Sequence, residues 1–234
     1  MTIEVAKDAR LGTTGPVTDE ARPGSVPRRR ALSRALDVVV ATAVLVVLSP
    51  LLAAVALIVR CTSRGPALFR QERLGLSRRP FVMYKFRTMR TGCDDRAHRE
   101  YVAALLSEPA LAGHAGGVYK LADDPRVTRL GRWLRETSID ELPQLINVLK
   151  GEMALVGPRP VLPWEAELFG PEHDARFDVP PGITGLWQCS GRNTLTMSQA
   201  LDLDVEYVRR RSLHLDLAIL LRTVPCVLGR VGVR

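Results

Sequence analysis

Two adjacent carboxylates, followed two residues later by a proline, form a stretch of the chain that could do chemistry. The stretch reads Thr137-Ser138-Ile139-Asp140-Glu141-Leu142-Pro143-Gln144. Because proline is tolerated in a helix only within the first turn, Pro143 predicts a helix over about 141–150 with its N-cap near Asp140. A carboxylate at such an end stays ionised beside N–H groups that bind phosphate. Ionised Asp140 could therefore attack phosphorus or bind Mg²⁺, while Glu141 moves a proton.

A purely structural role explains the same residues. Asp140 would cap the helix and Glu141 would favour its positive end, or Ser138 and Glu141 would form a capping box. On these residues alone the structural interpretation is the simpler one.

Cations that could bind phosphate lie on both sides of this stretch. In Gly157-Pro158-Arg159-Pro160, two prolines fix the backbone around one arginine, whose guanidinium can bind phosphate through two parallel hydrogen bonds. Further cations and turns occur in Lys85-Phe86-Arg87-Thr88-Met89-Arg90 and in Pro180-Pro181-Gly182-Ile183-Thr184-Gly185, followed by Trp187-Gln188 and Gly191-Arg192. A solvated turn, a basic edge strand and a core tryptophan would explain each piece separately.

The segment from Val38 to Val59 contains 22 residues without a charge. At a rise of ~1.5 Å per residue it reaches about 33 Å, enough to span a bilayer core. Pro50 interrupts it, and Ser49 could satisfy a backbone carbonyl that the proline leaves without a donor. Arginines flank both ends, although a spanning helix usually has its positive flank on one side. These observations leave a spanning helix and a re-entrant, Pro-kinked helix equally open.

The rest of the chain predicts a compact α+β body that is mainly helical. The chain has 234 residues, is 46% hydrophobic and carries a net charge of +8, which excludes a wholly disordered protein. Scattered cysteines and histidines argue against a zinc or dithiol site. We expect a disordered tail over 1–27, a mobile loop over 108–118, short strands at 67–69 and 81–84, and helices at about 95–107, 126–136, 198–211 and 213–228, with Pro225 interrupting the last.

Taken together, the carboxylates, the cations and the apolar segment favour phosphoryl chemistry on a lipid-borne substrate. In sequence and order the chain resembles the bacterial sugar transferases of the monotopic polyprenyl-phosphate phosphoglycosyl transferase type. The resemblance covers about residues 28–230. It rests on Ser49-Pro50, Phe69-x-Gln71-x-Arg73-x-Gly75, Tyr84-Lys85-Phe86-Arg87-Thr88-Met89, Asp124-Pro125-Arg126-x-Thr128-Arg129-x-Gly131, Thr137 to Leu145, Asn147 to Met153, Val156 to Pro160, Pro181 to Gly185 and Gly191-Arg192.

The resemblance implies a reaction and a set of site residues. The enzyme would transfer a sugar-1-phosphate from a UDP-sugar to undecaprenyl phosphate and release UMP. Asp140 would be the nucleophile of a covalent phosphosugar-aspartyl intermediate and would bind Mg²⁺, and Glu141 would assist the lipid phosphate. The cations expected to bind substrate phosphate are Lys85, Arg135, Arg159 and Arg192.

The resemblance also implies a place in the cell. Ser49 and Pro50 would break the membrane helix, over 28–64, so that it re-enters one leaflet. The catalytic domain, over 65–234, would lie on the cytoplasmic face of the inner membrane. Its product would begin an exopolysaccharide, capsule, O-antigen or glycoconjugate and pass to downstream glycosyltransferases. A dimer is one alternative for the oligomeric state, and glucose or galactose is the expected sugar.

A non-catalytic, membrane-anchored basic binding protein is the alternative interpretation. It would explain the net charge but not the carboxylate pair. From Arg28 to Arg90 the chain has thirteen Lys and Arg residues against Asp37 and Glu72, so the positive charge surrounds the apolar segment. This placement indicates an anionic membrane surface and argues against nucleic acid as the partner.

Overall fold

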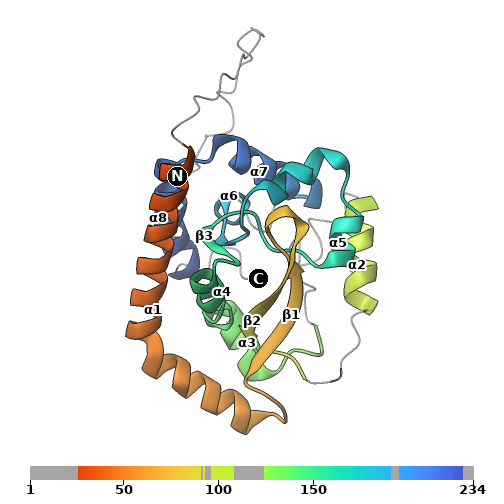
Figure 1. The fold of residues 1–234 in the computed structure, drawn as a ribbon. Helices are drawn as coiled ribbons and strands as arrows, with labels where there is room; N and C mark the ends of the chain where they lie inside the picture. Colours follow the sequence, from red (N-terminus) through yellow and green to blue (C-terminus); the bar gives the residue numbers. More distant parts are fainter. Residues whose placement is uncertain (1–25, 91, 93–95, 108–123, 191–194, 229–234) are drawn as a thin grey trace, which may run out of the picture.

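The long apolar segment forms one helix that lies along the side of a mixed α+β body (Figure 1). The computed structural model describes residues 26–90, 92, 96–107, 124–190 and 195–228. Helix α1 spans Val26–Thr62 and contains Pro50, and its ribbon changes direction partway along. Within it, Ala31–Thr62 is long and apolar enough to cross a membrane.

Ser49 compensates for the hydrogen bond that Pro50 cannot make. In an α-helix the residue at position 50 would donate its N–H to the carbonyl of Val46, but proline has no N–H. The Ser49 hydroxyl donates to that carbonyl at 2.8 Å instead. This confirms the predicted role of Ser49 and allows the helix to continue through the proline.

One side of α1 packs on the body and the other carries exposed apolar side chains. Ala41, Val55 and Val59 are buried, and only 11% of the most apolar window of the helix is buried. The side chains of Val39, Val46, Val47 and Leu57 are each more than 60% exposed. A surface of this composition suits a lipid environment better than water.

A β-hairpin forms the centre of the body. Strand β1 (Leu68–Leu74) pairs antiparallel with β2 (Pro80–Phe86), and a short 3-10 turn, η1 (Leu76–Arg78), connects them. The predicted pair of strands is confirmed, and both strands are longer than predicted.

The predicted helices are present with small shifts in their ends. They are α2 (Arg96–Ser107), α3 (Arg129–Glu136), α4 (Gln144–Lys150), α7 (Met197–Arg210) and α8 (Leu213–Leu228). Capping explains two of the starts: Thr128 accepts from Gly131 N at 2.9 Å, and Thr196 and Gln199 form a capping box. Helix α8 runs through Pro225, so the expected interruption is wrong; the proline removes one hydrogen bond, to the carbonyl of Leu221, and the helix ends three residues later.

The turn-rich passage after residue 150 contains structure that the sequence did not predict. Strands β3 (Ala154–Val156) and β4 (Gly182–Thr184) pair in parallel, and α5 (Pro163–Glu167) and the 3-10 helix η4 (Pro171–Asp178) lie between them. Helix α6 (Leu186–Cys189) follows. A Cβ on Gly182 would lie 2.1 Å from Gly157 N, so the close approach of the two segments requires glycine.

The mixed, mainly helical fold class is confirmed, whereas the domain limits stay predictions. The buried core joins β2, α4, β3, α7 and α8 to the upstream half of α1; its largest members are Met83, Met153, Tyr207 and Ile219. Residues 1–25 of the expected 1–27 tail and the expected loop at 108–118 lie outside the described residues, whereas residues 26 and 27 already belong to α1, so the tail was predicted two residues too long.

We predict that Gly131→Ala destabilises the fold although alanine favours helices. A Cβ at this position would lie 2.0 Å from the backbone oxygen of Thr88, which cannot move without disturbing the chain after β2. The expected loss is about 1–3 kcal/mol, seen as a lower midpoint of thermal unfolding. Gly170→Ala is the matched control, because its Cβ would meet only the end of the flexible Glu172 side chain. Equal midpoints for the two variants would contradict the prediction.

Candidate active site

Asp140 lies in a tight turn before α4 and does not cap that helix. The 3-10 helix η3 spans Ile139–Glu141, and the N-cap position of α4 is Pro143, which has no side-chain capping bond. The expected capping roles of Asp140 and of Ser138 are therefore wrong. Backbone bonds within the turn explain this, since Glu141 N donates to Ser138 O at 3.2 Å and Leu142 N donates to Ile139 O at 3.2 Å.

The residue that precedes the turn is held in an unusual backbone conformation. Ser138 has a φ of 56°, in the left-handed region, and makes no side-chain capping bond. Non-glycine residues in this region cost free energy and concentrate at functional sites. The strained turn directs the chain so that Asp140 is buried and Glu141 is partly buried.

Cations from three separate segments surround this carboxylate pair. Lys85, on β2, places its Nζ 3.0 Å from Glu141 Oε1, and an Arg159 guanidinium nitrogen lies 3.9 Å from the same oxygen. Arg135, at the end of α3, acts electrostatically on both Asp140 and Glu141. Five of the six predicted catalytic and phosphate-binding residues thus gather at one place: Asp140, Glu141, Lys85, Arg135 and Arg159.

Burial opposes the charge on the two cations that face the carboxylates. Removal from water lowers the pKa of Lys85, and the negative charges of Glu141 and Asp140 act in the opposite direction. Burial likewise lowers the pKa of Arg135, with Asp140 as the strongest opposing influence. Burial and the two carboxylates therefore act in opposite directions on the pKa of both cations, and burial has the larger effect.

Thr88 fixes the side chain of Arg135. Arg135 Nε donates to Thr88 Oγ1 at 2.9 Å, and Thr128 N donates to Thr88 O at 3.0 Å. The close approach at Gly131 brings α3 against this segment. Thr88 was missed as a site residue, although it lies in the Lys85–Arg90 motif.

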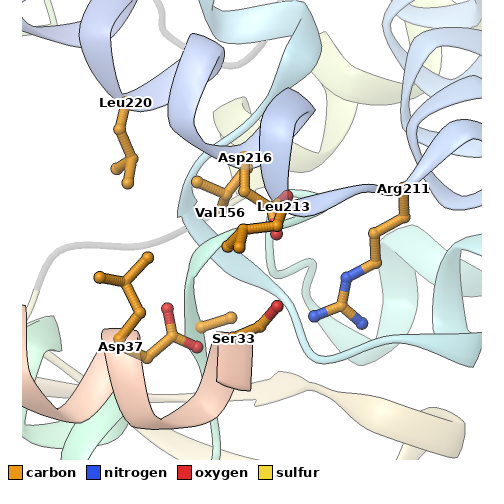
Figure 2. Close-up of a pocket in the computed structure, with 9 residues that line it drawn as sticks. Ser33, Asp37, Val156, Arg211, Leu213, Asp216 and Leu220 are labelled. Atoms are coloured by element: carbon orange, nitrogen blue, oxygen red, sulfur yellow. The ribbon is translucent and has the colours of Figure 1, made fainter. Parts of the chain in front are cut away.

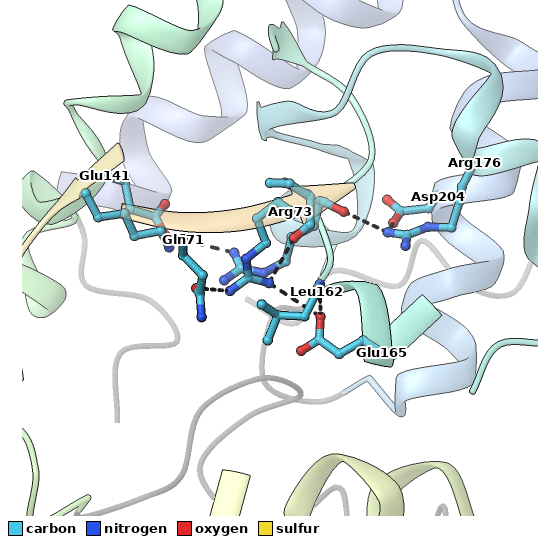
Figure 3. A network of polar contacts seen from close by, with 10 residues as sticks. Gln71, Arg73, Glu141, Leu162, Glu165, Arg176 and Asp204 are labelled. Carbon is cyan, nitrogen blue, oxygen red and sulfur yellow. Dashed lines mark hydrogen bonds and ion pairs between the residues drawn. The ribbon is translucent and has the colours of Figure 1, made fainter. Parts of the chain in front are cut away.

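The segment around Arg159 is held by a polar network that reaches across the body (Figure 3). Arg73 donates to Pro160 O at 3.3 Å and to Gln71 Oε1 at 2.8 Å, and it pairs with Glu165 at 3.4 Å. Glu165 also accepts from Leu162 N at 2.7 Å. Arg73 and Gln71 belong to a motif of the resemblance but were not predicted to be site residues.

A second polar cluster joins α1 to the strand that leads to Arg159. Asp37 Oδ1 accepts from Leu155 N at 3.1 Å. Figure 2 shows Ser33 and Asp37 on α1, together with Arg211, which follows α7, and Asp216, in the first turn of α8, among the residues that line one small pocket. The membrane helix is thereby bonded directly to β3.

Two predicted residues lie apart from the site, and one cannot be placed. Ser49 and Pro50 lie in the exposed part of α1. Arg192 falls in residues 191–194, outside the described residues.

The carboxylates suit a metal ion that takes most of its ligands from the substrate and from water. Within the described residues, no group of three or more His, Cys, Asp or Glu side chains could hold a metal. Magnesium in phosphoryl-transfer sites is commonly bound by one or two carboxylates together with phosphate oxygens and water. Asp140 fits that mode, whereas Glu141 already pairs with Lys85.

We predict that Lys85 titrates below the ordinary lysine range and Lys150 above it. Burial lowers the pKa of Lys85, whereas a hydrogen bond to the Tyr84 hydroxyl raises the pKa of Lys150. The sequence has four lysines, so the ¹³C-methyl NMR signals of a dimethylated sample can be assigned by single Lys→Arg variants. Glu141→Gln should lower the pKa of Lys85 further and leave that of Lys150 unchanged. A Lys85 signal that is insensitive to this variant would contradict the described ion pair.

Comparison with known proteins identifies the family of this chain. The family model described as "Bacterial sugar transferase" matches residues 28–230. The chain is 42% identical over 227 residues to a UDP-glucose:undecaprenyl-phosphate glucose-1-phosphate transferase of Caulobacter vibrioides, covering 92% of this chain and 78% of the relative. It is 41% identical over 194 residues to the exopolysaccharide production protein ExoY of Sinorhizobium fredii, covering 83% and 84%.

Other relatives are considerably longer. An undecaprenyl-phosphate galactose phosphotransferase of Salmonella typhimurium is 40% identical over 205 residues, which are 87% of this chain and 42% of the relative. The chain spans less than half the length of several relatives of this kind. The family match nevertheless covers most of the chain, including every placed site residue, and the protein belongs to the bacterial sugar transferase family.

Proposed function

We propose that the protein is a phosphoglycosyl transferase that moves a sugar-1-phosphate from a UDP-sugar to undecaprenyl phosphate and releases UMP. The observation that carries the proposal is the buried Asp140 next to Glu141, with Lys85, Arg135 and Arg159 around them. The printed names of the Caulobacter and Salmonella relatives describe transfers of this kind. Glucose and galactose, which those names contain, are the first sugars to test.

In the first step, an Asp140 carboxylate oxygen attacks the β-phosphorus of the UDP-sugar. A new P–O bond forms to the aspartate, and the bond between the β-phosphorus and the bridging oxygen breaks. The electron pair leaves with UMP, and the sugar phosphate stays on the enzyme as an acyl phosphate ester. Burial of Asp140 supports this role, because a poorly hydrated carboxylate is a better nucleophile.

In the second step, an oxygen of the lipid phosphate attacks the same phosphorus and expels Asp140. The product is undecaprenyl diphospho-sugar, and the carboxylate returns to its starting state. Glu141 is placed to accept a proton from an incoming phosphate that arrives protonated. Its contact with Lys85 keeps it ionised and therefore able to do so.

The cations would bind the phosphate oxygens in both steps. Lys85, Arg135 and Arg159 approach from β2, α3 and the segment after β3, so they can contact different faces of a diphosphate. Mg²⁺ held by Asp140 would neutralise charge on the diphosphate when it is bound. Arg192 is retained as a further candidate for the nucleotide.

We also propose that α1 is re-entrant and that both of its ends lie on the cytoplasmic face of the inner membrane. Near its start, Arg34 donates to the carbonyls of Val148 and Leu149, at the end of α4. Near its end, Arg87 donates to Val59 O at 3.2 Å and to Ser63 O at 2.7 Å. If α1 were straight, residues 34 and 63 would lie about 44 Å apart, which is more than the thickness of a bilayer core. Both ends nevertheless bond to the same body, which supports a helix that leaves the membrane on the side where it entered.

The carboxylate pair lies between the two halves of this helix. Ile139 packs with the cluster that includes Val55 and Val59, and Leu142 packs with the cluster that includes Ala41. These two residues directly flank Asp140 and Glu141 in sequence. A phosphate at the membrane surface, attached to a lipid beside α1, would therefore be close to the site.

The non-catalytic alternative is less well supported. A basic binding surface would present its cations to solvent, but Lys85 and Arg159 face Glu141 and are less than 20% exposed. The membership of the sugar transferase family also favours an enzyme.

We predict that Asp140→Asn abolishes UMP release. With a UDP-sugar and no lipid phosphate, the wild-type protein should retain a sugar phosphate on the peptide that contains Asp140, detectable by mass spectrometry. Glu206→Gln, a change to an exposed carboxylate on α7, is the control and should leave the rate unchanged. UMP release from Asp140→Asn at a near-normal rate would refute the nucleophile assignment. A panel of UDP-sugars in the same assay identifies the sugar.

We predict that both ends of α1 are labelled from the same side of the membrane. In a background without native cysteines, Ala31→Cys and Arg64→Cys introduce exposed thiols at the two ends. A membrane-impermeant maleimide should react with both in inverted vesicles and with neither in intact spheroplasts. If one end reacts in each preparation, α1 spans the membrane and the re-entrant proposal is wrong.

A further inference from the structure

A buried ion pair lies behind Arg159, on the side away from Glu141. Arg176, in η4, places a guanidinium nitrogen 2.7 Å from Asp204 Oδ2, on α7, and the two side chains are 1% and 2% exposed. Burial raises the pKa of Asp204 to about 6, so the carboxylate is still ionised at neutral pH. Figure 3 shows the pair at one end of the network that includes Arg73.

This ion pair is a poor source of stability for the fold. Asp204 Oδ1 and two of the Arg176 nitrogens are buried without a hydrogen-bond partner. Removing charged groups from water is costly, and an incompletely bonded pair is often no more stable than apolar residues of the same volume. Its presence therefore calls for a role other than stability.

The pair lies against two aromatic rings, and it contacts the backbone of Arg159. The Arg176 guanidinium lies 5.2 Å from the ring centre of Phe169 and 5.4 Å from that of Phe177. Its NH2 group, which bonds Asp204, also donates to Arg159 O at 2.8 Å. Asp204 fixes the guanidinium, and the guanidinium in turn holds the peptide group of Arg159.

Two neighbouring contacts restrain the same segment. The Tyr207 hydroxyl oxygen lies 3.1 Å from Val156 O and 2.6 Å from Asp216 Oδ1, with one proton to share between these acceptors, and Arg73 donates to Pro160 O at 3.3 Å. Asp204 and Tyr207 are three residues apart on α7 and so lie on one face of that helix. Carbonyls at both ends of the Val156–Pro160 segment are thus held by buried or partly buried side chains.

We propose that Arg176 and Asp204 are positioning residues that set the Arg159 guanidinium against Glu141 and the substrate diphosphate. The assignment of Arg159 to the diphosphate rests on the proposed function. Arg159 stands only 3.9 Å from Glu141, so a small displacement of its backbone changes which oxygens it can reach. Neither Arg176 nor Asp204 contacts the carboxylate pair in the described network; they act through Arg159.

The first test is kinetic and uses Arg176→Met and Asp204→Asn. Methionine keeps an apolar side chain between the two rings, and asparagine keeps the shape of the carboxylate. We expect kcat/KM for UMP release from the UDP-sugar to fall by up to about 10²-fold, as for a misplaced substrate-binding group. Arg176→Lys should restore part of the loss.

A double-mutant cycle separates positioning from an independent effect. If Asp204 acts through Arg159, Asp204→Asn should cause little further loss in an Arg159→Met background. Losses that multiply in the double variant would overturn the proposal. Leu201→Ala is the stability control, because Leu201 is buried on the same helix in a separate cluster with Trp187. Leu201→Ala should lower the midpoint of thermal unfolding yet leave kcat/KM close to the wild-type value. If Leu201→Ala lowered kcat/KM as much as Asp204→Asn does, the proposal would also be overturned.

Hydrogen exchange tests the contact without using activity. Peptides that cover residues 156–162 should exchange faster in Arg176→Met than in the wild type or in Leu201→Ala. Unchanged exchange in Arg176→Met would refute the positioning role. If the wild-type protein released no UMP from any UDP-sugar, the proposed function would fail, while the exchange experiment would still decide whether the pair holds this segment.

Discussion

The pairing of ionised carboxylates with cations at a poorly hydrated site is the constraint on which the rest of the structure depends. Asp140 and Glu141 are neighbours in sequence, so each raises the electrostatic cost of ionising the other. Lys85, Arg135 and Arg159 offset that cost, and they come from three segments that are far apart along the chain. The hairpin, α3 and the β3 segment must therefore be held at fixed distances from the η3 turn, which explains the close backbone approach at Gly131.

Helix α1, which is long and apolar enough to cross a membrane, is also bonded to the segments that carry the site. Arg34 and Asp37 bond α1 to α4 and β3, and Arg87 bonds the other end of the helix to the chain after β2. Because α4 follows the carboxylate pair and β3 precedes Arg159, any movement of α1 is passed directly to the site. Attachment of the helix at both ends also leaves its middle free to present apolar side chains to lipid.

The sequence predicted the parts of the site that depend on local rules. The Pro143 rule placed a helix start close to the carboxylates, and the loss of an N–H at Pro50 led correctly to the Ser49 bond. The sequence failed where bonds of long range decide. The three-residue strands β3 and β4 pair across the intervening α5 and η4 and are too short to show a period. The 3-10 turn at Asp140 was missed for a different reason, because its short-range backbone bonds leave no pattern in the sequence. Arg176 and Asp204 are 28 residues apart and have no shared signal, so only the fold reveals that they meet.

The two contacts of Glu141 suggest how the site can receive a substrate without first being rebuilt. Lys85 lies within hydrogen-bond distance of Glu141 at 3.0 Å, whereas Arg159 stands at 3.9 Å, beyond that distance. An incoming phosphate therefore meets a closer Glu141 contact at Lys85 than at Arg159. Since the backbone of Arg159 is held from behind, its guanidinium can turn toward phosphate at little entropic cost. Of these two cations, Lys85 therefore holds Glu141 through the shorter contact, and Arg159 is the one that a phosphate can draw away from Glu141 more readily.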